Sequence, residues 1–142
     1  MTTSTSDADA LIGDLTLAQW EALWADVPDG FAGPHRNLRG KSGLYRAICH
    51  GETVVIGKSS GKGGSDLKRR ISDFIRPSSS GRNYDAGEFL NANHNTLQLM
   101  VLVTGTGRSA REMAAALKGP MLDLHMPRRN VPAHIVAGAI KG

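Results

Sequence analysis

Seven basic residues lie between Lys58 and Arg82, with only two aspartates among them, and Lys41 lies just upstream. Clustered cations attract polyanions through counterion release and long-range steering. A solvent-exposed face with solubilising charge is the alternative interpretation. The placement of the charges favours nucleic-acid binding. The residues expected to contact the nucleic acid are Lys62, Lys68, Arg69 and Arg76.

Two strands and a helix are expected to position these side chains. Gly43 to His50 is predicted to be a strand and Glu52 to Gly57 its antiparallel partner, because the residues between them are typical of a tight turn. After a glycine-rich loop, apolar side chains at helical spacing predict a helix from Leu67 to about Arg76. Either Ser65 or Asp66 can cap its start. The apolar residues of this helix are Leu67, Ile71, Phe74 and Ile75.

Four short motifs in this order resemble the signature of the GIY-YIG nuclease family. They are Gly43-Leu44-Tyr45, Val55-Ile56-Gly57-Lys58, Leu67-Lys68-Arg69-Arg70 and His125-Met126-Pro127-Arg128-Arg129-Asn130. The resemblance covers roughly residues 41–130. Val55 stands where the second motif of the family has a tyrosine.

The resemblance implies metal-dependent hydrolysis of phosphodiester bonds in DNA, with Mg²⁺ or Mn²⁺ as cofactor. Tyr45 would be the general base or orient the water, Arg70 and Lys58 would hold the phosphate, and Asn130 would help to arrange the site. These residue types suit the hydrolysis, because a base must activate the water and positive side chains must stabilise the negative charge that develops on the phosphate oxygens. Each residue also has an ordinary structural interpretation. Tyr45 could be a half-buried strand residue, and Lys58 a charge at the end of a strand. Arg70 could be a solvent-facing helix residue, with Arg69 as the competing candidate, and Asn130 a turn residue.

The metal ligand is where the sequence departs from the family, in which a glutamate on a later helix holds the metal. Counting back from Asn130 by the family's interval reaches Lys118 or Ala115, and neither can ligate magnesium. Glu112 is the nearby carboxylate on that helix, although a glutamate there also suits helix capping. Three explanations are compatible with the sequence. Glu112 is the ligand, the protein is a natural variant that binds without cutting, or a glutamate within Ala114–Ala116 or at Lys118 has been replaced by design.

The remaining pattern predicts one α+β domain, with a small three-stranded antiparallel sheet flanked by helices. Residues 1–14 are expected to be a disordered lead, and residues 15–142 a single GIY-YIG-like domain. An amphipathic helix from Leu15 to Ala25 begins at a Thr16 cap, and Ala86 to Asn95 is short helix or irregular. Thr96 to Thr104 alternates as a strand. A helix from Ala110 to Lys118 would be capped by Ser109 with Glu112, then be interrupted or kinked at Pro120.

Bulk composition sets the remaining expectations. The chain has 142 residues, a net charge of +4 and a single cysteine, which excludes an intramolecular disulfide. No apolar run is long enough for a membrane span, so a cytoplasmic protein is the simplest interpretation. We expect a DNA endonuclease of restriction, phage defence or mobile-element function. The alternatives are a catalytically inactive nucleic-acid-binding domain of the same fold and an unrelated α+β interaction protein. Cutting both strands would require a homodimer or two binding events.

Overall fold

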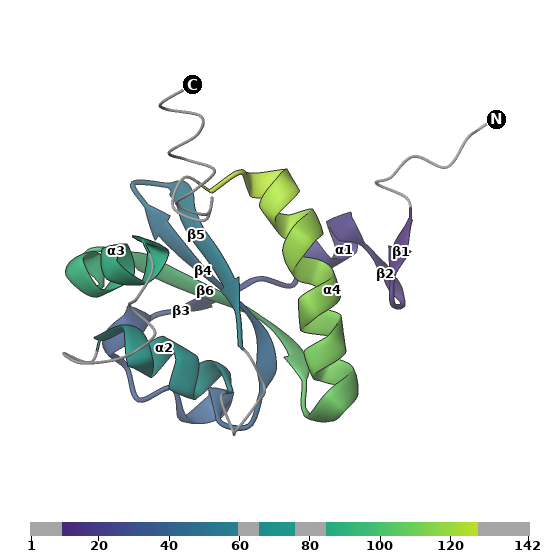
Figure 1. The fold of residues 1–142 in the computed structure, drawn as a ribbon, viewed down its shortest axis with the longest axis horizontal. Helices are drawn as coiled ribbons and strands as arrows, with labels where there is room; N and C mark the ends of the chain where they lie inside the picture. The colour runs from purple at the N-terminus through teal and green to yellow at the C-terminus, as the bar shows by residue number, and fades with distance from the viewer. Residues whose placement is uncertain (1–9, 60–65, 76–84, 128–142) are drawn as a thin grey trace.

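A computed structural model describes residues 10–59, 66–75 and 85–127. A central sheet separates two helical layers (Figure 1): α4 (Gly107–His125) and α1 (Leu17–Glu21) lie on one face, and α2 (Leu67–Ile75) and α3 (Asp85–Asn93) on the other. The predicted α+β class is confirmed. Within the described residues, no helix combines the length and hydrophobicity that a membrane span requires.

The main sheet is antiparallel and has four strands in the order β3-β6-β4-β5, not the three that we predicted. The central hairpin of β4 (Ser42–Cys49) and β5 (Glu52–Lys58) and the strand β6 (Gln98–Gly105) lie where the sequence placed them. The additional edge strand is β3 (Ala25–Val27), which pairs with β6 from Ala25 opposite Val101 to Val27 opposite Leu99. Three residues before a proline are too short to show strand alternation, so the pattern missed this strand.

The N-terminal region is also more extended than expected. β1 (Leu11–Ile12) pairs with β2 (Leu15–Thr16), so part of the predicted disordered lead forms a small hairpin. The predicted helix from Leu15 to Ala25 shrinks to α1. Thr16 caps it as predicted, in a reciprocal capping box with Gln19. Residues 1–9 lie outside the described residues.

Alternating side chains of the strands fill two separate cores. Leu44 and Ile56 point toward α4 and pack with Trp20, Trp24, Leu102, Ala114, Leu117 and Met121. Tyr45 and Val55, one residue along each strand, belong to the opposite core with Phe31, Leu67, Ile71, Phe74 and Leu90. The two-residue period of the strands therefore sends neighbouring residues of the first motif to opposite faces.

The N-terminal cap predicted for α2 is confirmed, whereas the one predicted for α4 is not. Asp66 caps α2, since its carboxylate accepts hydrogen bonds from the Arg69 and Gly40 amides at 2.8 and 2.6 Å. In contrast, the predicted cap of α4 by Ser109 and Glu112 is wrong. The helix begins two residues before Ser109, after the Thr106 N-cap, and Pro120 lies within it.

Candidate functional site

Tyr45 is held by the sheet itself. It lies opposite Gly57 in β5 and opposite Val101 in β6, and only 2% of its surface is exposed. A Cβ atom added at Gly57 would overlap the Tyr45 hydroxyl and ring. The glycine of the second motif therefore provides the space that the tyrosine of the first motif occupies.

An aromatic contact links Tyr45 to Arg70. The Tyr45 and Phe74 rings are tilted by 57° with centroids 5.3 Å apart. The Arg70 guanidinium carbon lies 5.2 Å from the centroid of the same Phe74 ring. Phe74 is fully buried, so it fixes the position of both neighbours through packing and a cation–π contact.

Lys58 ends β5, directly opposite Leu44 in β4. The next residue, Ser59, is buried and bonded to the first motif: its amide donates to the Gly43 carbonyl at 3.0 Å, and its hydroxyl accepts from the Gly43 amide at 3.1 Å. Gly43 is also where β4 approaches β6 closely, because a Cβ atom there would overlap the Leu102 carbonyl. These two hydrogen bonds fix the backbone next to Lys58 at the end of the hairpin.

A third cation, Lys118 of α4, joins Lys58 and Arg70. Burial lowers the pKa of the Lys118 amine below its ordinary value, and the charges of Lys58 and Arg70 lower it further. The positive charges of Lys58 on β5 and Arg70 on α2 thus both act on the amine of Lys118 on α4. We call Lys58, Arg70 and Lys118 the cationic site. Among the described residues, neither Lys58 nor Lys118 forms an ion pair.

Packing along α4 determines where Lys118 lies. Ala114, Leu117 and Met121 are fully buried against the sheet, and Lys118 flanks this stripe as a half-buried side chain. Residues three and four apart share one helix face, so Lys118 follows Ala114 by one turn. The helix contacts both β4 and β5, the edge strand that ends in Lys58.

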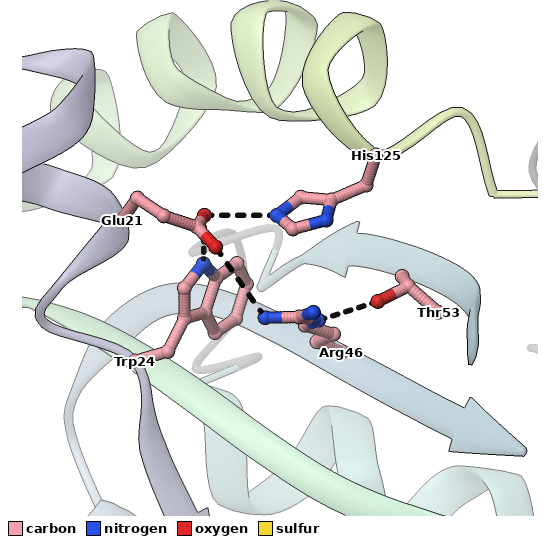
Figure 2. Close-up of polar contacts among 5 residues, drawn as sticks. All are labelled: Glu21, Trp24, Arg46, Thr53 and His125. Atoms are coloured by element: carbon pink, nitrogen blue, oxygen red, sulfur yellow. Dashed lines mark hydrogen bonds and ion pairs between the residues drawn. The ribbon is translucent and has the colours of Figure 1, made fainter. Parts of the chain in front are cut away.

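A second group of polar residues holds the C-terminal end of α4 (Figure 2). Glu21 Oε1 accepts from Trp24 Nε1 at 2.9 Å and lies 2.8 Å from His125 Nε2. Glu21 Oε2 is 3.7 Å from Arg46, whose Nε donates to Thr53 Oγ1 at 2.6 Å. We call these five residues the polar network. It joins α1, β4, β5 and the last residue of α4.

The predicted metal ligand, Glu112, is not at this site. Its side chain is 67% exposed and pairs with Arg108 at 3.2 Å, on the side of α4 away from the buried stripe. Ala114 is fully buried, whereas Ala115 and Ala116 are exposed. Of the positions considered for a lost glutamate, Lys118 is the one that interacts with Lys58 and Arg70. Within the described ranges, no group of three acidic, histidine or cysteine side chains is arranged to hold a metal ion.

The residues that meet at the cationic site do not fit a magnesium ion, which requires oxygen ligands. The cationic site does fit an anion, and phosphate is the anion that the family resemblance would bring there. Sequence reasoning reached Lys118 by counting and treated it as the replacement of a ligand. The signal that could have shown that Lys118 lies beside the core was its helical spacing from the apolar Ala114 and Leu117.

The other predicted residues are only partly placed. Arg69 is exposed and Lys68 half-buried on α2, next to the cationic site in sequence. Lys62, Arg76 and Asn130 lie outside the described residues, so their predicted roles remain predictions. No family model matches this chain, and comparisons with curated proteins and with solved structures found no match.

Proposed function

We propose that this chain binds the phosphate backbone of DNA at the cationic site. The observation that carries the proposal is that the charges of Lys58 on β5 and Arg70 on α2 both act on the half-buried Lys118 of α4. Bringing like charges together costs free energy, and a bound anion would lower that cost. Arg70 suits this role because a guanidinium contacts phosphate oxygens in a bidentate manner. Lys68 and Arg69 extend the positive charge along α2.

The test is DNA binding measured over a range of salt concentrations. We expect the wild-type affinity for a labelled duplex to fall steeply with salt, because binding releases counterions. Arg70→Met should weaken binding about tenfold and flatten the salt dependence. Arg108→Met is the matched control, since it removes an equal charge from the exposed side of α4. Equal affinities for wild type, Arg70→Met and Arg108→Met would contradict the assignment of the site.

Cleavage of DNA is the second candidate function. The contact of both Tyr45 and Arg70 with the Phe74 ring favours it, since it places a tyrosine and a phosphate-binding arginine beside the same side chain. A nicking assay on supercoiled plasmid in magnesium tests this candidate. Cleavage that is lost in Tyr45→Phe and in Arg70→Ala, and kept in Glu112→Gln, would support hydrolysis at this site. Cleavage that survives the first two substitutions would place it elsewhere.

A further inference from the structure

A cavity of about 680 Å³ lies between the edge strand β3, the end of β6 and the connection from Pro34 to Leu38. Its volume suits a small organic ligand. Val27 and Val101 line it and belong to the core on the α2 side of the sheet. Val103 lies on the same face two residues further along β6, and it is 38% exposed. The cavity therefore has an apolar wall, open to solvent, that the cationic site does not use.

His35 is the buried polar residue of this cavity, and only 5% of its surface is exposed. Its Nε2 atom lies 2.6 Å from the carbonyl oxygen of Gly30. A carbonyl oxygen only accepts hydrogen bonds, so Nε2 carries the proton, and Nδ1 of the neutral ring is an acceptor. Among the described residues, Nδ1 has no hydrogen-bond partner. A ligand that donates to Nδ1 would remove the cost of this unsatisfied buried atom.

The formal charges around the cavity cancel. Asp26 and Asp29 are negative, and Arg36 and Lys41 are positive. Net charge therefore selects neither an anion nor a cation. The features that remain are the apolar wall and the unpaired acceptor of His35, and they suit a neutral molecule with a planar apolar ring and an N–H donor.

We propose that this cavity binds a nucleobase that carries an amino group, as adenine and cytosine do. The ring would lie on Val101 and Val103, and the amino group would donate a hydrogen bond to His35 Nδ1. Proteins recognise unpaired bases by packing on the ring and hydrogen bonding to its edge. A free nucleoside and an unpaired base in a nucleic-acid strand present the same chemistry to the cavity.

The first test follows the His35 ring by NMR in protein labelled with ¹⁵N-histidine. Adenosine should shift the Nδ1 resonance in a saturable manner, because this nitrogen then accepts a hydrogen bond. Purine riboside keeps the ring and the sugar but lacks the amino group. It should bind about tenfold more weakly than adenosine and leave the Nδ1 resonance nearly unchanged. An Nδ1 resonance that adenosine does not move, or equal affinities for the two nucleosides, would overturn the inference.

The second test changes the apolar wall. Val103→Arg places a charged side chain where the ring would pack and should weaken adenosine binding about tenfold. Leu124→Arg is the matched control, because Leu124 is also a partly exposed apolar residue but lies on α4, away from the cavity. Thermal unfolding shows whether both variants keep the fold. Equal affinities for adenosine in folded Val103→Arg and Leu124→Arg would contradict the proposed site.

A short single strand of deoxyadenosine distinguishes the two sources of the base. An Nδ1 shift with both this strand and adenosine would assign the cavity to unpaired bases in a strand, whereas a shift with adenosine alone would assign it to a free nucleoside. Adenosine carries no phosphate, so its binding does not require the cationic site. A failure of duplex binding would therefore overturn the proposed function without affecting this inference.

Discussion

Helix α4 contributes to two polar regions, the polar network and the cationic site, which differ in how their charges are paired. At its C-terminal end, the Glu21 carboxylate lies between Arg46 and His125 and also accepts from Trp24, so charge and hydrogen-bonding capacity are matched. Two turns earlier, Lys118 meets only cations among the groups that shift its pKa. The polar network therefore pairs opposite charges, whereas the Lys118 amine at the cationic site has its pKa lowered by burial and by like charges.

Reversing one charge of the cationic site should have the largest effect. Lys58→Glu removes a cation and adds a carboxylate at the cationic site, where it would repel a bound phosphate. We expect DNA affinity at low salt to fall about 100-fold. Fluorescence anisotropy with a labelled duplex measures this change. Arg108→Glu makes the same reversal on the exposed side of α4 and should change affinity only slightly. Comparable losses in both variants would mean that net charge, not the site, governs binding.

Breaking the polar network should give the opposite phenotype, with stability lost and binding kept. Glu21→Ala leaves Arg46 and His125, which are mostly buried, without their carboxylate. We expect the free energy of unfolding in urea to fall by about 2 kcal/mol. Glu112→Ala breaks an exposed pair and should cost no more than about 0.5 kcal/mol. A loss of DNA affinity in folded Glu21→Ala would show that the two regions are coupled.

The smallest expected effect is a gain in stability from Lys118→Met without ligand. The pKa of Lys118 is lower in the folded protein than in the unfolded chain, so the unfolded chain binds more protons between the two values. The cost of the charged amine is thus present in full below the folded-state pKa. It fades as pH rises toward the ordinary pKa of lysine.

Melting temperatures should therefore favour Lys118→Met most at neutral pH, and its advantage should shrink in alkaline buffer. An advantage that stays constant with pH would be due to apolar packing of methionine instead. Adding pyrophosphate should reverse the order at neutral pH, because only the wild type then gains from the bound anion.

Local patterns in the sequence predicted the elements that build half of the site. The turn between His50 and Glu52, the alternation in β6 and the Asp66 cap all act through neighbouring residues, and each was found as expected. The residues of the cationic site come from three elements that only tertiary packing brings together, and residue spacing along the sequence does not predict that packing. Counting back from Asn130 reached Lys118 but could not show that Lys118 is half-buried or that the charges of Lys58 and Arg70 act on its amine. The cap at Ser109 failed because α4 begins directly after the turn that ends β6.

The two tryptophans of the chain, Trp20 and Trp24, both lie in the core beneath α4. The Trp24 indole is moreover bonded to the carboxylate that holds the end of this helix. Their intrinsic fluorescence therefore reports how α4 is docked, while the Tyr45–Phe74 side of the sheet contributes almost nothing to that emission. Since Lys118 is carried by the same helix, a ligand that pulls on it would shift the emission of an unlabelled protein. The molecule thus contains its own optical probe for the docking of α4 on the sheet.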